Sequence, residues 1–134
     1  MKLYSEQGFC RWKLLAKTTG EMIGFCGVGF WRDVQDPEIG WWLARRYWGL
    51  GLATEAARTA LRDAFVRVRL ERIVSIAMPE NVSSIRIMEK LGLRFECEFE
   101  DEGVRLLRYT IERSTSVQNV ILEEPSPSKV KPAQ

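Results

Sequence analysis

The chain contains no histidine among its 134 residues. This absence excludes imidazole bases, serine–histidine triads and zinc sites that need histidine ligands. Any acid–base chemistry must therefore use carboxylates, Tyr, Ser, water or an amine of lowered pKa. Cysteine is scarce as well, because Cys10, Cys26 and Cys97 are scattered without Cys-x-x-Cys spacing. Buried, reduced thiols are expected at all three, and no metal site is predicted.

The chain also lacks a strong excess of charge and a long apolar run. Twenty Lys and Arg against 18 Asp and Glu give a net charge of +2, which is too small to argue for nucleic acid as a partner. No apolar run is long enough to span a membrane, and no signal-peptide pattern is present. A cytoplasmic protein that binds neither nucleic acid nor membrane is expected.

Hydrophobic periodicity and turn residues divide the chain into strands and two helices. Strands are predicted at 9–16, 21–31, 38–44, 72–78, 95–99 and 104–111, and helices at 52–68 and 82–91. The strand–helix–strand step over 38–78 predicts a right-handed crossover and a mixed sheet. Residues 1–113 are expected to form one domain. The Pro-, Ser- and Lys-containing segment 114–134 is expected to be a disordered tail.

The segment that follows the strand at 38–44 has the composition of a phosphate-binding loop. Arg46-x-x-Gly49-x-Gly51 leads directly into the helix predicted at 52–68. Glycine allows close approach of the backbone, and the first N–H groups of a helix have no partner within the helix. The spacing is not that of a Rossmann or Walker loop, which require a third glycine or Gly-Lys-Ser/Thr. A strand-to-helix turn that merely contains glycine remains an alternative.

A second motif lies in residues 81–92, which read Asn-Val-Ser-Ser-Ile-Arg-Ile-Met-Glu-Lys-Leu-Gly. Asn81 is a helix N-cap candidate and Gly92 fits a C-terminal cap. The two motifs, in this order and structural context, resemble the coenzyme A motifs of the GNAT family of N-acetyltransferases. The resemblance covers about residues 8–113. It is nearest to the branch that acetylates ribosomal protein N-termini, aminoglycosides and spermidine.

The resemblance implies an α/β (α+β) fold with a mixed, mostly antiparallel sheet flanked by helices. It implies acetyl-CoA as co-substrate and a primary amine, either a protein N-terminus or a small amine, as acceptor. It also implies that the sheet splays at the strand 38–44, which leaves backbone groups for the pantetheine arm. The residues expected to contact acetyl-CoA are Trp42, Leu43, Ala44, Arg46, Trp48, Gly49, Leu50, Gly51, Leu52, Ala53, Thr54 and Asn81.

Two residues are candidates for proton transfer. Glu38 opens the strand that leads to the cofactor loop, and it is either the base or an ordinary strand-entry carboxylate. Many family members carry a Tyr as acid seven residues after the Asn, but Met88 stands there. The related branch suggests Ser84 instead, which is otherwise a helix-end hydrogen bonder. Asn81 is expected to cap the helix, contact pantetheine, or do both.

The family's first strand and the two helices after it have no counterpart before residue 8. Those elements normally cover one sheet edge and form part of the acceptor pocket. An open edge at the strand 9–16 would favour pairing with another chain, so a homodimer is a possible state. The alternative to an enzyme is a non-catalytic CoA-binding or interaction module derived from a truncated acetyltransferase.

Overall fold

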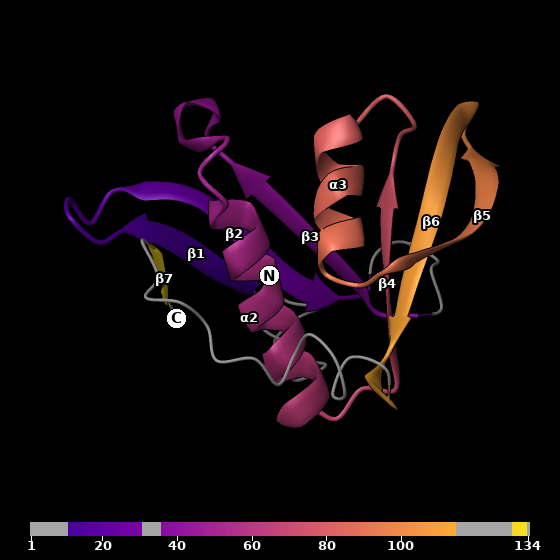
Figure 1. Ribbon diagram of the computed structural model, residues 1–134, viewed down its shortest axis with the longest axis horizontal. Coiled ribbons are helices and arrows are strands. Elements are labelled where there is room, and N and C mark those ends of the chain that lie inside the picture. Colours follow the sequence, from indigo (N-terminus) through magenta and orange to yellow (C-terminus); the bar gives the residue numbers. More distant parts are fainter. Residues whose placement is uncertain (1–10, 31–35, 115–129, 134) are drawn as a thin grey trace.

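The computed structural model describes residues 11–30, 36–114 and 130–133. Within them, seven strands form one sheet in the order β5-β6-β4-β3-β2-β1-β7 (Figure 1). Only β3 and β4 are parallel neighbours among the strands of this sheet. The elements are β1 (Arg11–Ala16), β2 (Met22–Gly29), β3 (Glu38–Leu43), the 3-10 turn η1 (Arg45–Tyr47), α2 (Leu52–Val66), β4 (Arg72–Ala77), α3 (Val82–Lys90), β5 (Arg94–Asp101), β6 (Val104–Glu112) and β7 (Val130–Ala133).

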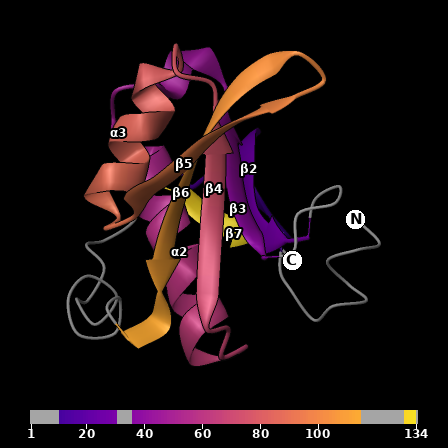
Figure 2. The ribbon, with the colours of Figure 1, turned by 90° about the vertical axis from the view of Figure 1, so that its right-hand side faces the viewer.

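The predicted mixed, mostly antiparallel sheet flanked by helices is confirmed. Both helices lie on the same side of the sheet, as the side view in Figure 2 shows. The helix α2 turns a face with four alanines toward the sheet, and small side chains let a helix pack close to strands. Its buried residues are Leu52, Ala56, Ala57, Ala60, Leu61, Ala64 and Phe65.

Local signals fix the ends of α3. The Oδ1 atom of Asn81 accepts a 3.2 Å hydrogen bond from the Ser84 N–H, so Asn81 is the predicted N-cap. Gly92 has a φ of 95°, and the N–H of Leu93 donates to the Met88 carbonyl at 3.0 Å. This is the expected glycine C-cap. The helix α2 ends two residues before the predicted position, because Arg69 turns the chain with a φ of 64°.

The outer edge of β1 is covered by the chain itself. β7 pairs antiparallel with β1, with Lys13 opposite Ala133 and Ala16 opposite Val130. The expectation of an open edge is therefore wrong from Lys13 to Ala16. Residues 130–133, which fall within the predicted disordered tail, form a strand here. Residues 115–129 and 134 lie outside the described residues, as does the predicted start of β1 at Phe9.

The described cysteines differ from each other. Cys26 is fully buried in β2, and desolvation raises the pKa of its thiol to about 12. The prediction of a buried thiol is wrong for Cys97, which is exposed like most residues of β5, a strand with no buried side chain. Cys10 lies outside the described residues. No helix in the described part of the chain is long and apolar enough to cross a membrane.

Candidate functional site

Strands β3 and β4 meet only where they begin. Glu38 lies opposite Val74, and the Val74 N–H donates to the Pro37 carbonyl at 2.9 Å. One residue further along each strand, the buried Ser75 hydroxyl donates to the Ile39 carbonyl at 3.0 Å. Beyond that link the described strands have no paired register, and Figure 1 shows them diverging. The implied splay of the sheet is thus confirmed, and it opens a wedge beside residues 40–43.

The alternation of a strand decides which backbone groups face this wedge. The Ala44 N–H donates to the Ile23 carbonyl at 2.7 Å, and the Ala44 carbonyl accepts from the Tyr47 N–H at 2.9 Å. The expectation that Ala44 presents unpaired groups is therefore wrong. Because successive residues direct their N–H and C=O groups to opposite sides, the backbone of Trp42 also faces β2, and the expectation is wrong for it too. The backbone groups of Trp41 and Leu43 face the wedge. Sequence reasoning missed Trp41.

The loop after β3 carries two glycines in the left-handed region. Gly49 has a φ of 81° and Gly51 a φ of 78°. Gly51 is the N-cap of α2, and no side chain caps this helix end. The Glu55 N–H donates to the Gly51 carbonyl at 3.0 Å, so the amides of residues 52–54 have no acceptor within the helix. These amides and the helix dipole make this end of α2 suited to an anion.

The wedge and the start of α2 open into one cleft of about 440 Å³. Ten of the predicted site residues line it: Trp42, Leu43, Trp48, Gly49, Gly51, Leu52, Ala53, Thr54, Asn81 and Ser84. Six further residues line it: Trp41, Tyr47, Ser83, Arg86, Ile87 and Lys90. The structure therefore brings together both sequence motifs, which the chain separates by β4.

Four predicted residues lie outside the lining of this cleft: Glu38, Ala44, Arg46 and Leu50. The Arg46 guanidinium pairs with the Glu21 carboxylate and lies 5.2 Å from the centre of the Tyr47 ring. Leu50 is 53% exposed. The pairing of Arg46 has no local signal, because Glu21 comes from the β1–β2 hairpin.

The helix α3 gives the cleft a basic wall. Arg86 and Lys90 are exposed, one turn apart, and both line the cleft. Neither residue is among those that the sequence analysis expected to contact acetyl-CoA. Their spacing in the sequence could have revealed them. Residues 83, 86, 87 and 90 are three or four positions apart and therefore lie on one face of the helix. Asn81 both caps α3 and lines the cleft, and Ser84 lies in the first turn above it.

Glu38 lies at the closed base of the wedge, on the face of the sheet away from the helices. Ile39 and Leu43 belong to the buried core, so the alternate residues Glu38, Gly40 and Trp42 point to the opposite face. Trp42 is 52% exposed there and stacks on Phe25, with ring centres 5.9 Å apart. Glu38 thus shares a face with the exposed side chain of Trp42, rather than with the loop 45–51.

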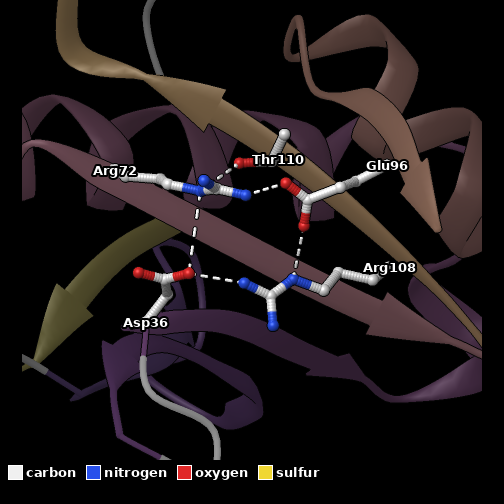
Figure 3. A network of polar contacts seen from close by, with 5 residues as sticks. All are labelled: Asp36, Arg72, Glu96, Arg108 and Thr110. Atoms are coloured by element: carbon white, nitrogen blue, oxygen red, sulfur yellow. Dashed lines mark hydrogen bonds and ion pairs between the residues drawn. The ribbon is translucent and has the colours of Figure 1, made fainter. Parts of the chain in front are cut away.

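An ionic network flanks Glu38 on this outer face, and Figure 3 shows its members. Arg72 pairs with Glu96 and donates to the Thr110 hydroxyl at 3.0 Å. Arg108 lies 2.5 Å from the Asp36 carboxylate and 2.6 Å from that of Glu96. Two arginines and two carboxylates balance each other, so the network carries no net charge. Its members come from strands β4, β5 and β6 and from Asp36, which precedes β3, and sequence reasoning did not find it.

Metal ligation has no support in the part of the chain that the structure describes. No group of three or more His, Cys, Asp or Glu side chains there has the arrangement to hold a metal ion. The groups that line the cleft are backbone amides, aromatic rings, the basic side chains of Arg86 and Lys90, and the polar side chains of Thr54, Asn81, Ser83 and Ser84.

Comparison with known proteins agrees with this geometry. Residues 1–94 match the family model described as acetyltransferase (GNAT) domain. The chain is 36% identical over 91 residues to the uncharacterized protein YkkB of Bacillus subtilis, covering 66% of this chain and 52% of that protein. It is 34% identical over 87 residues to the uncharacterized N-acetyltransferase p20 of Bacillus licheniformis, covering 64% and 49%.

A solved structure shares the fold. The acetyltransferase (GNAT family) from Bacillus anthracis superposes with a TM-score of 0.69 at 27% identity, covering 78% of this chain and 66% of that one. The chain spans about half the length of the curated relatives described above. With the family model matched over most of its length, the chain belongs to the GNAT acetyltransferase family.

Proposed function

We propose that this chain is an acetyl-CoA-dependent N-acetyltransferase that acts on a primary amine. One observation carries the proposal: the amides at the start of α2 and the wedge between β3 and β4 open into the same cleft. The first feature suits a pyrophosphate, and the second suits an extended arm that hydrogen-bonds to a strand edge.

The residues of the cleft fit acetyl-CoA. The amides of residues 49–54 would hold the pyrophosphate, with glycine at 49 and 51 leaving room for it. The backbone N–H and C=O groups of Trp41 and the N–H of Leu43 would pair with the pantetheine arm inside the wedge, because the Leu43 carbonyl already accepts from the Trp48 indole. Arg86 and Lys90 would meet the nucleotide phosphates from the other wall. When bound, acetyl-CoA supplies an acetyl group activated as a thioester.

The transfer needs one base and one acid. The neutral amine nitrogen attacks the thioester carbonyl carbon, the C–N bond forms, and the C–S bond then breaks with its electrons moving to sulfur. A proton leaves the nitrogen and another returns to the sulfur. We assign removal of the amine proton to Glu38, acting through water because it lies outside the cleft lining, and protonation of the sulfur to the Ser84 hydroxyl in the cleft. Water then takes the proton from Glu38 and returns one to Ser84. An N–H group of the wedge would stabilise the tetrahedral oxyanion.

The first test measures acetyl-CoA binding. Glycine substitutions inside and outside the cleft provide variants and matched controls. Gly49, Gly51, Gly20 and Gly103 all have a positive φ, and no described atom lies within 4 Å of a Cβ built on any of them. Asn tolerates this conformation better than other residues. Gly49→Asn or Gly51→Asn should weaken acetyl-CoA binding in calorimetry by roughly tenfold or more, because the side chain fills the pyrophosphate position.

The controls Gly20→Asn and Gly103→Asn sit in hairpin turns outside the cleft lining and should leave affinity unchanged. Equal acetyl-CoA affinities for all four folded variants would show that the pyrophosphate does not bind at this loop. The alternative, a non-catalytic CoA-binding module, predicts the same affinities but no release of CoASH with any amine.

The finer assignments remain our proposals. The acceptor is a primary amine, either a protein N-terminus or a small amine. A homodimer also stays a prediction, but an open edge from Lys13 to Ala16 does not support it, because β7 pairs with β1 there. Sedimentation of the full chain at micromolar concentration tests the dimer directly.

A further inference from the structure

Gly40 has no evident structural reason to be glycine. It lies inside β3, where glycine weakens a strand because it adds backbone entropy and packs no side chain. It is not among the glycines with positive φ. A Cβ built on it meets no described atom within 4 Å. Gly24 is different, because its Cβ would lie 2.2 Å from the Trp42 carbonyl oxygen. The pairing of Gly40 with Gly27 continues the β2–β3 register without a bulge. An interior strand glycine without a bulge or bend marks the close approach of a ligand or of another backbone.

The position of Gly40 indicates which ligand. The last link between β3 and β4 is the hydrogen bond from Ser75 to the Ile39 carbonyl, so the wedge opens beside Gly40. Glu38 and Trp42 each lie two residues away on the same face, at roughly 7 Å along the strand. A molecule resting on Gly40 would therefore have a carboxylate on one side, an indole on the other, and the wedge next to it.

We propose that Gly40 is the floor of the acceptor site and that the acceptor is a monoamine with a flat apolar body. This inference rests on the proposed acetyl transfer. The amine nitrogen lies between Glu38 and the wedge, and the apolar body lies on the exposed Trp42 ring, which Phe25 supports by stacking at 25°. Stacking on an exposed aromatic ring is a favourable contact for a flat molecule.

The charges on this face argue against a polyamine. The Asp36, Arg72, Glu96 and Arg108 network sums to zero, so it does not attract a second cationic centre. The register puts Lys13 opposite Phe25, and Phe25 opposite Trp42. Lys13 is exposed and therefore lies on the same face, beyond the aromatic pair of Phe25 and Trp42. Its ammonium group would repel the far end of a polyamine that lay along this face.

Phenethylamine and spermidine are the probes, with acetyl-CoA as donor. Released CoASH is measured by chromatography, because the exposed Cys97 would react with thiol reagents. We expect saturable acetylation of phenethylamine, with kcat/KM at least tenfold above that for spermidine. Gly40→Val should raise the KM for phenethylamine at least tenfold without changing the Kd for acetyl-CoA. Trp42→Ala should also raise this KM.

The matched control is Phe95→Ala, which removes an aromatic side chain of similar exposure (55%) from the edge strand β5, three strands away from β3, and should change neither constant. Saturation-transfer NMR with phenethylamine alone gives a readout that does not depend on the donor. The wild-type signal should disappear in Gly40→Val.

Three results would overturn the inference: an unchanged KM in Gly40→Val, an NMR signal that survives this substitution, or a preference for spermidine. Failure of the wild-type protein to bind acetyl-CoA would instead refute the proposed function, and the NMR comparison would still decide whether Gly40 is part of an amine site.

Discussion

The indole Nε1 of Trp48 donates a 2.7 Å hydrogen bond to the backbone carbonyl of Leu43. This bond joins the loop that carries Gly49 and Gly51 to the last residue of β3. It also occupies the one carbonyl at the end of the strand that faces the wedge. The phosphate loop and the strand edge are therefore held at a fixed distance from each other, although Trp48 itself is 56% exposed.

Trp48→Phe should weaken acetyl-CoA binding by roughly twofold to tenfold, because it removes one hydrogen bond and keeps an aromatic ring. Calorimetry measures the effect. Leu50→Ala is the control, since Leu50 is an equally exposed apolar residue of the same loop that does not line the cleft. If both variants bind as the wild-type protein does, the Trp48 bond has no part in forming the site.

Arg86 and Lys90 should favour ligands with more phosphate groups. Replacing both by Gln should weaken acetyl-CoA binding by roughly threefold to tenfold, because two exposed cations each contribute modestly. The variant should also lose any preference for acetyl-CoA over its analogue without the 3′-phosphate. Arg94→Gln, an exposed cation outside the cleft, should retain both values. An unchanged preference would place the 3′-phosphate elsewhere.

Glu38→Gln should lower turnover of the amine by ~10²–10⁴-fold at neutral pH, because the amide cannot accept the amine proton. The Kd for acetyl-CoA should stay the same, since Glu38 does not line the cleft. Steady-state kinetics and calorimetry on the same sample separate the two effects. Near-full turnover in this variant would remove Glu38 from the mechanism.

Gly24→Ala should destabilise the fold by about 1–3 kcal/mol through overpacking. The added Cβ would lie 2.2 Å from the Trp42 carbonyl oxygen, so β2 and β3 would have to move apart. Chemical denaturation measures the loss. Gly40→Ala, on the adjacent strand with open space around its Cβ, should lose no stability. Equal stability of the two variants would mean that β2 and β3 adjust without cost.

The features that the sequence predicted well are local. The caps of α3 at Asn81 and Gly92 depend on residues within one helical turn, and the loop glycines act through their own φ angles. Side-chain partners from distant strands were not predictable. Arg46 meets Glu21 across 25 residues, and Arg108 meets Asp36 across 72. Ala44 was misjudged because its hydrogen bonds depend on the register with β2, which periodicity does not fix.

The pairing of β7 with β1 has a consequence for the order of folding. Lys13 and Ala133 are neighbours across the sheet, although almost the whole chain separates them. Contacts of such sequence separation form slowly, because a long loop must close before they stabilise anything. During translation β1 is made long before β7 emerges from the ribosome. The nascent chain therefore passes through a period in which this edge of the sheet has no β7 beside it and is open to association with other chains.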